Sequence, residues 1–309
     1  MPPRVVILLS DKRSGSTMFQ EELCRHPDIR HVAYTPHTYF ETHHWLKAAV
    51  LLDMPASLFS GARVYGGYGS RKNARRYLVD CVKGNVADFQ VPEDDERLIV
   101  EGWDALCRHY ARPVFFEKSP QLVAHWAALS LLLKWMEQTE FDVRVVGLVR
   151  NPMAVFYSAW KLFHTPPEKR QFGWLNICRN MLAFRELVEP ERFLTVRYDD
   201  ILRDPIAQFQ TVCEFIGVAP HGDVGSGVRA PDRPKWRDDP EFTLQLDPAV
   251  SQMAHAFGYS DAELDNPEKQ PVPARRRLAE SLRSGRKLSC ARFRQRVLKP
   301  LALCTWQRK

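Results

Sequence analysis

The alternation of apolar and polar positions along this chain predicts strands and helices in turn. Five apolar runs of strand length are separated by segments whose apolar residues recur every three or four positions. The runs cover residues 4–9, 31–34, 114–117, 143–149 and 193–197. Strands that alternate with helices usually pair in parallel and are covered on both faces. The sequence therefore predicts an α/β protein with a mostly parallel five-stranded sheet flanked by helices.

The clearest helical pattern lies over residues 71–90, between the second and third apolar runs. Further helices are expected over residues 18–25 and 153–163 and around Trp174–Leu182. Residues 53–70 are predicted as a loop because they are rich in glycine, with Gly61, Gly66, Gly67 and Gly69.

A short polar loop, Ser10–Thr17, joins the first apolar run to a helical pattern. In α/β proteins a strand, a tight loop and a helix start together hold phosphate groups, through backbone N–H groups and the helix dipole. Gly15 allows close approach of the backbone, and Arg13 adds positive charge. Hydroxyl donors follow from Ser14, Ser16 and Thr17. The loop lacks the first glycine and the glycine–lysine pair of the triphosphate-binding motif. The alternative is an ordinary polar turn between a strand and a helix.

A second anion-binding candidate follows the fourth apolar run, at Arg150-Asn151-Pro152. Pro152 suits the first position of a helix, so Arg150 is expected at the carboxyl end of a strand, where open α/β sheets bind ligands. Ser158 lies about two turns into that helix, and with Arg150 it could hold a second phosphate. The alternative is an arginine that satisfies helix carbonyls or a surface carboxylate.

Together these segments resemble the sulfotransferase family that uses PAPS (3′-phosphoadenosine 5′-phosphosulfate). Arg13–Thr17 is similar to the family's [KR]-[ST]-G-[ST]-T loop, and Arg150-Asn151-Pro152 with Ser158 is similar to its R-[DN]-P…S motif. Val196–Pro205 and Phe116–Pro120 are similar to two further family segments, the second of which lines the acceptor site. The resemblance covers roughly residues 4–217 and implies the P-loop-like sulfotransferase fold.

The resemblance implies an enzyme that moves the sulfuryl group of PAPS to an acceptor hydroxyl or amine by in-line attack, releasing adenosine 3′,5′-bisphosphate. Arg13 would stabilise the charge that develops on the bridging oxygen. The backbone from Ser14 through Gly15 and Ser16 to Thr17 would hold the 5′-phosphosulfate. Arg150 and Ser158 would bind the 3′-phosphate, and Tyr198 would lie near the adenine. No metal is required.

The general base is open in the sequence. Many relatives have a glutamate just after the second strand, where this chain has Thr35. His37 is the first candidate, because an imidazole has a suitable unperturbed pKa, followed by Glu41 and then Glu117. His43 and His44 are expected at the exposed start of a helix. No spacing in this histidine-rich run predicts a convincing set of metal ligands.

Charge separates the chain into two parts. The net charge is +7, from 44 Lys and Arg against 37 Asp and Glu. Residues 275–309 alone hold twelve Lys or Arg and one acidic residue, Glu280. We therefore expect a catalytic domain over residues 1–266 and a linker with a basic, amphipathic helical tail over 267–309. The tail could bind a membrane surface or an acidic partner, or pack on the main domain. Nucleic acid is not the expected partner, because the tail carries few aromatic side chains for stacking on bases.

The cysteines and the hydropathy pattern favour a cytoplasmic protein. The seven cysteines are scattered without C-x-x-C pairs, as is usual for reduced thiols. No apolar run approaches the ~18 residues of a membrane span, and the first strand leaves no room for a signal peptide before it. A small-molecule, lipid or glycan acceptor is therefore expected. The alternatives are a nucleotide-dependent phosphotransferase and a noncatalytic nucleotide-binding or scaffold protein that uses its basic tail.

Overall fold

The structure is a computed structural model that describes residues 3–55, 68–229 and 234–267. The chain divides into two compact units, one of residues 1–234 with Leu244–Asp265, the other of Lys235–Thr243 with the residues from Asn266 onwards. The predicted basic tail, residues 267–309, lies outside the described residues except for its first position. So do Gly61, Gly66 and Gly67 of the predicted loop.

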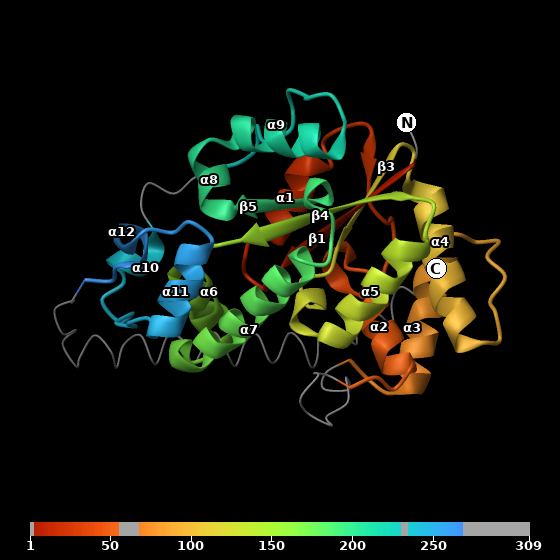
Figure 1. The fold of residues 1–309 in the computed structure, drawn as a ribbon, viewed down its shortest axis with the longest axis horizontal. Coiled ribbons are helices and arrows are strands. Elements are labelled where there is room, and N and C mark those ends of the chain that lie inside the picture. Colours follow the sequence, from red (N-terminus) through yellow and green to blue (C-terminus); the bar gives the residue numbers. More distant parts are fainter. Residues whose placement is uncertain (1–2, 56–67, 230–233, 268–309) are drawn as a thin grey trace, which may run out of the picture. The chain divides into compact units, whose positions relative to one another are not determined.

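The first unit is built around a five-stranded sheet in the order β2-β3-β1-β4-β5, and every pair of neighbouring strands is parallel. The strands are β1 (Arg4–Ser10), β2 (Ile29–Arg30), β3 (Val114–Lys118), β4 (Asp142–Val149) and β5 (Phe193–Arg197). The predicted α/β architecture is confirmed. Because the strands are parallel, their carboxyl ends meet at one edge of the sheet (Figure 1).

The second strand is shorter than predicted and lies earlier in the chain. Residues 31–34 are not a strand, because side chains occupy the backbone donors that a neighbouring strand would need. The N–H groups of Ala33 and Tyr34 both donate to Asn85 Oδ1, each at 3.0 Å. Ala33 N also donates to the Tyr110 hydroxyl at 2.9 Å. Only Ile29 and Arg30 pair with β3.

Helices cover both faces of the sheet. One face packs against α1 (Ser16–Leu23), α8 (Tyr198–Arg203) and α9 (Pro205–Ile216), where apolar side chains from β1, β3 and β4 meet Phe19 and Phe209. The opposite face meets α7 (Pro167–Arg185), since a side chain at Gly147 would contact Met181 Sδ at 3.1 Å. Figure 1 shows the two layers above and below the sheet. The other helices of this unit are α2 (His44–Leu51), α3 (Arg71–Lys83), α4 (Asp95–Tyr110), α5 (Trp126–Gln138), α6 (Pro152–Phe163), α7 (Pro167–Arg185), α11 (Pro248–Ala256) and α12 (Asp261–Leu264), with short 3₁₀ turns η1 (Thr38–Phe40), η2 (Leu122–Ala124) and η3 (Pro190–Arg192).

The four predicted helices are present, two of them with shifted ends. The first begins at Ser16 rather than residue 18, so Ser16 and Thr17 already belong to its first turn. The helix predicted over 71–90 ends at Lys83, because Gly84 follows and the ring of Tyr34 fills the space beside it. The helix after Pro152 extends to Phe163 as predicted. The apolar positions from Trp174 to Met181 are buried on α7.

The second unit contains α10 (Lys235–Asp238) among its described residues. There the Asn266 side chain donates to the carbonyl oxygen of Phe242 at 3.1 Å. Across the described part of the chain, no helix combines the length and the apolar character needed to cross a membrane. The five cysteines within it are free thiols.

Candidate functional site

The loop between β1 and α1 has the geometry of an anion cradle. Arg13 and Gly15 both have positive φ, 72° and 90°, which turns the chain tightly into the helix. A side chain at Gly15 would collide with the ring of Tyr198, because its Cβ would lie 2.1 Å from Tyr198 Cε2. Only glycine therefore lets α8 approach this closely. The first turn of α1, starting at Ser16, leaves backbone N–H groups without intrahelical acceptors at the carboxyl end of β1.

Arg150 lies against this loop. Its Nη1 donates to the carbonyl oxygen of Arg13 at 2.8 Å, and its guanidinium lies 4.6 Å from the centre of the Tyr198 ring. The following residue, Asn151, caps α6 by accepting from Met153 N at 3.0 Å. Within the part of the chain that the structure describes, the buried Nε of Arg150 has no hydrogen-bond acceptor. The sequence-predicted residues Arg13, Gly15, Arg150 and Tyr198 are thus brought together.

Ser158 completes this group from α6. Arg13 Nε donates to Ser158 Oγ at 3.0 Å, and the Arg13 guanidinium lies 5.9 Å from the ring centre of Phe163. Burial and the charge of Arg150 lower the pKa of the Arg13 guanidinium. Among the described residues, neither Arg13 nor Arg150 forms an ion pair with a carboxylate. Two guanidinium groups with unneutralised charge beside free backbone N–H groups suit a polyanionic ligand.

Lys118 connects this loop to the candidate bases. It is the last residue of β3, and its side chain is fully buried. Its Nζ donates to Thr17 Oγ1 at 3.3 Å and lies 3.4 Å from Glu41 Oε1. Burial lowers the pKa of Lys118, and the Glu41 carboxylate opposes that shift. The family resemblance places this lysine in the segment Phe116–Pro120, expected to line the acceptor site, but sequence reasoning gave it no contact with the Arg13–Thr17 loop or with Glu41. Its place at a strand's carboxyl end beside β1 was a usable signal for both.

Glu41 lies at the centre of a cluster with two histidines. Its Oε2 lies 3.0 Å from His43 Nε2 and 3.5 Å from His37 Nδ1. Burial raises the pKa of Glu41, but the hydrogen bond from His43 and the charge of Lys118 outweigh it, so the pKa lies below its ordinary value. The His37 side chain is 39% exposed, whereas the side chains of Glu41 and His43 are buried. His37 is thus the member of this cluster that a ligand can reach.

The sequence-based expectation for His43 and His44 was wrong in one respect. Both lie at the start of α2, as predicted, but they are buried rather than exposed. His44 packs beside Trp45 and Trp103, and its Nε2 lies 2.9 Å from the carbonyl oxygen of Ile99. Burial lowers the pKa of His44 to about 4. This histidine is therefore a neutral core residue.

The structure brings three possible metal-ligand side chains of this histidine-rich run together, although their spacing in the sequence predicts no such set. Ligand atoms of His37, Glu41 and His43 all lie within 4.8 Å of one another, and two imidazoles with a carboxylate can bind zinc. However, the ammonium of Lys118 already neutralises Glu41 from its other oxygen, and it would repel a divalent cation. The electrostatics therefore favour an anion near this cluster over a metal ion in it.

Glu117, the third candidate base, is held inside the protein. Its Oε1 accepts hydrogen bonds from the hydroxyls of Thr42 at 2.7 Å and Ser119 at 2.5 Å. Burial raises the pKa of Glu117, although these two hydrogen bonds act to lower it. Its carboxyl group thus anchors the segment that leads into α2.

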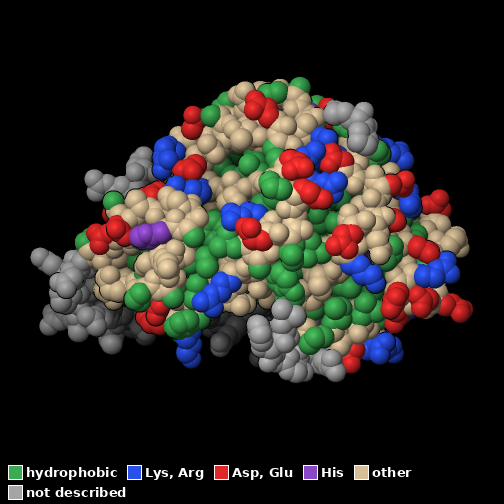
Figure 2. Space-filling model, viewed as in Figure 1, with side chains coloured by type: hydrophobic (Ala, Val, Ile, Leu, Met, Phe, Trp, Pro, Cys, Tyr) green, Lys and Arg blue, Asp and Glu red, His purple; other side chains and the backbone are tan. Residues whose placement is uncertain are grey.

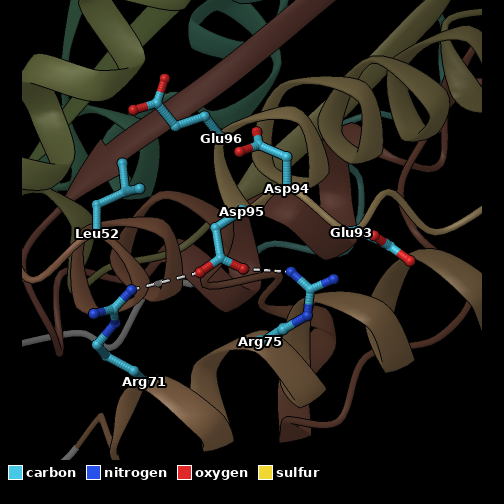
Figure 3. A pocket seen from close by; sticks show the side chains of 7 residues that line it. All are labelled: Leu52, Arg71, Arg75, Glu93, Asp94, Asp95 and Glu96. Carbon is cyan, nitrogen blue, oxygen red and sulfur yellow. Dashed lines mark hydrogen bonds and ion pairs between the residues drawn. The ribbon is translucent and has the colours of Figure 1, made fainter.

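A pocket of about 370 Å³ opens beside Arg13. Its wall combines the apolar residues Pro120, Ala124, Phe163 and Ile177 with the buried ion pair between Asp11 and Arg170. A larger pocket of about 580 Å³ lies elsewhere, between α3 and the start of α4 (Figure 3). There Arg71 and Arg75 both pair with Asp95, and three further carboxylates line the wall. Figure 2 shows acidic side chains gathered on the side of the molecule that carries α3 and α4. An anionic ligand fits the smaller pocket better.

Comparison with known proteins gives a match that covers most of the first unit. The model of the family described as "Sulfotransferase family" matches residues 3–222. Among curated proteins, the omega-hydroxy-beta-dihydromenaquinone-9 sulfotransferase Stf3 of Mycobacterium bovis (strain ATCC BAA-935 / AF2122/97) is 22% identical over 252 residues, 70% of this chain and 63% of the relative. The chain thus spans less than two thirds of the length of the curated relatives it matches.

Two solved structures share the fold. The sulfotransferase domain from the Synechococcus PCC 7002 olefin synthase superposes with a TM-score of 0.53 and 23% identity, covering 84% of this chain and 96% of that domain. The sulfotransferase domain from the curacin biosynthetic pathway also gives a TM-score of 0.53, with 19% identity, over 84% of this chain and 98% of that domain. The fold predicted from the sequence motifs is confirmed.

Proposed function

This chain belongs to the sulfotransferase family, and we propose that it transfers the sulfuryl group of PAPS to a hydroxyl or amine acceptor. One observation carries the proposal. Arg13 and Arg150 lie against the Gly15 loop without a carboxylate partner among the described residues, and Arg150 Nε has no hydrogen-bond acceptor. Such a site gains from an anion with more than one phosphate-like group.

The loop and the two arginines divide the donor between them in this proposal. The backbone N–H groups of residues 14–17 hold the 5′-phosphosulfate, supported by the hydroxyls of Ser14, Ser16 and Thr17. Arg150 and Ser158 bind the 3′-phosphate, which distinguishes PAPS from ATP. Tyr198 lies beside Arg150 and offers its ring to the adenine.

PAPS supplies an activated sulfuryl group, and adenosine 3′,5′-bisphosphate leaves when the acceptor attacks in line. Negative charge develops on the bridging oxygen, and Arg13 is the cation assigned to stabilise it. Lys118 can assist, because its ammonium lies against Thr17 of the same loop. Since these side chains supply the positive charge, the proposed transfer includes no metal ion.

His37 is the proposed general base. Its imidazole is half-exposed, and Glu41 lies close enough to orient it. Glu41 is the second candidate, but it is buried and already bound by His43 and Lys118. Glu117 is the third, and its hydrogen bonds to Thr42 and Ser119 oppose that role.

The acceptor is proposed to be a small molecule, lipid or glycan with an apolar portion. The pocket beside Arg13 supports this class, because Phe163, Ile177 and Pro120 form part of its wall. The curated relative is named for a hydroxylated menaquinone, a molecule that likewise carries a hydroxyl group on an apolar body.

Thermal unfolding with nucleotides tests the proposal. Adenosine 3′,5′-bisphosphate at about one hundred times its dissociation constant should add about 2.7 kcal/mol to the free energy of unfolding. AMP, which lacks the 3′-phosphate, should add much less at the same concentration. Stabilisation by ATP with magnesium but not by the bisphosphate would contradict the proposal and favour a phosphotransferase.

A further inference from the structure

Asp199 links the two sequence motifs of the proposed nucleotide site to a segment near the end of the first unit. Its Oδ2 accepts from the backbone N–H of Asn151 at 2.8 Å and from the hydroxyl of Tyr259 at 2.7 Å. Asn151 is the neighbour of Arg150 in the chain, and Asp199 is the neighbour of Tyr198. Asp199 Oδ2 therefore connects Tyr259 to Asn151, which is next to Arg150 in the chain. Asp199 itself is next to Tyr198.

Arg197 fixes the same segment from β5. Its Nη1 donates to the carbonyl oxygen of Gly258 at 2.9 Å, and its Nη2 donates to Glu263 Oε1 at 2.6 Å. Its guanidinium also lies 4.1 Å from the ring centre of Tyr259. Ser260 and Glu263 form a reciprocal capping box at the start of α12, which orients the Glu263 carboxylate.

A second bond reaches Asn151 directly. Its side-chain Nδ2 donates to the backbone carbonyl oxygen of Glu263 at 2.8 Å. Asn151 is thus held by Asp199 through its backbone and by Glu263 through its side chain. Residues 258–263 lie beyond the stretch that matches the family model, which ends at residue 222.

We propose that residues 258–263 support the 3′-phosphate site, with Tyr259 and Glu263 as positioning residues that hold Arg150 in its binding geometry. The inference rests on the proposed function, in which Arg150 binds the 3′-phosphate. These residues act through Asn151 and Asp199 and need not touch the nucleotide.

The physical reason is that Arg150 has few contacts of its own to fix it. Its guanidinium is held by one carbonyl oxygen and by the Tyr198 ring, and its Nε has no acceptor. Its position therefore depends on the backbone at Asn151. Tyr259 is only 2% exposed, so solvent does not compete for the hydrogen bond between its hydroxyl and Asp199.

Tyr259→Phe is the direct test, because it removes one hydroxyl and keeps the ring under Arg197. We expect the dissociation constant for adenosine 3′,5′-bisphosphate to rise about fivefold to tenfold, as for loss of one buried hydrogen bond, with AMP affected less than twofold. Tyr110→Phe is the matched control. It also loses a buried tyrosine hydroxyl, which binds Asn85 and Ala33, and it should leave both affinities unchanged.

Combining Tyr259→Phe with Arg150→Ala separates the two proposals. If the segment acts through Arg150, Tyr259→Phe should cost no further bisphosphate affinity once Arg150 is gone. If Arg150→Ala weakens the bisphosphate and AMP equally, the assignment of the 3′-phosphate fails. If Arg150→Ala discriminates between them but Tyr259→Phe does not, the inference about residues 258–263 is overturned.

Glu263→Gln provides a second variant should Tyr259→Phe not fold. It weakens the ion pair with Arg197 and leaves the backbone bond to Asn151 in place, so a smaller loss of bisphosphate affinity is expected, again without loss of AMP. An equal loss of both nucleotides would show a general structural effect and would also overturn the inference.

Discussion

Two arginine pairs in this molecule show how the same residue type serves different ends. Arg71 and Arg75, on α3, share the carboxylate of Asp95 (Figure 3). Arg75 also donates to the carbonyl oxygen of Pro92 at 2.6 Å. Arg13 and Arg150 lie at the carboxyl edge of the sheet beside a serine, a carbonyl oxygen and a tyrosine ring.

The difference lies in how the positive charge is satisfied. At the first pair Asp95 binds both guanidinium groups, and three further carboxylates line the same pocket. These four negative charges outweigh the two positive ones, which leaves little reason for an anion to bind, even in the larger pocket. At the second pair the charge is left for a ligand, and burial with mutual repulsion lowers the pKa of Arg13. Unneutralised charge, rather than pocket size, therefore identifies the functional site.

The largest effect on turnover is expected at His37, the proposed general base. His37→Ala should lower turnover of PAPS by about 10² to 10⁴, the range for a general base, with nucleotide affinity nearly intact. Initial rates of adenosine 3′,5′-bisphosphate release measure this. Normal turnover would move the base to Glu41 or Glu117.

Arg13→Ala should lower turnover by about 10² to 10³, because it removes a cation aimed at the developing charge. Arg75→Ala removes an arginine that pairs with Asp95 in the pocket between α3 and α4, so the same rate assay should show no change. Equal rates in the two variants would remove the distinction between the pairs.

His44 differs from both arginine pairs, because burial keeps its imidazole uncharged. Burial holds its pKa at about 4, against an ordinary value of 6.5. Between these pH values the unfolded chain binds a proton that the folded protein excludes. Above pH 6.5 His44 therefore costs no stability. As the pH falls from 6.5 towards 4, protonation of His44 in the unfolded chain lowers the free energy of unfolding, by about 3 kcal/mol in total.

Urea unfolding at pH 7 and pH 4.5 measures this dependence. His44→Gln cannot titrate, so its free energy of unfolding should fall less than that of the unchanged protein over the same interval. The same fall in both proteins would show that His44 is not the group responsible.

Arg150→Ala should weaken adenosine 3′,5′-bisphosphate by about tenfold to a hundredfold, the worth of charge-assisted hydrogen bonds to one phosphate. AMP has no 3′-phosphate and should bind almost as before. Calorimetric titration of both nucleotides gives the ratio, and an unchanged ratio would count against the assignment.

The smallest effect concerns stability without ligand. Arg75→Ala should lower the free energy of unfolding by about 1 kcal/mol or less, because it breaks a partly exposed ion pair. Arg150→Ala should be neutral or slightly stabilising, since it relieves repulsion with Arg13. A clear loss of stability in Arg150→Ala would mean that this charge is already satisfied within the protein.

The proposed nucleotide site at the carboxyl edge of the sheet could be predicted from the sequence, because each of its two main segments directly follows or lies close to the end of a strand. A strand followed closely by Arg13–Thr17, or directly by Arg150–Pro152, places those residues at the same sheet edge wherever the helices pack. The proton-transfer cluster could not, because residues 35–44 form no regular strand. Their placement depends on distant partners such as Lys118 and Glu117, and the burial of His43 and His44 follows from that packing.

The most direct test of the central claim is a crystal structure with adenosine 3′,5′-bisphosphate bound. We expect the 5′-phosphate against the backbone N–H groups of residues 14–17 and the 3′-phosphate within hydrogen-bonding distance of Arg150 and Ser158. Binding of the nucleotide at another place, or with its 3′-phosphate turned away from Arg150, would contradict the account.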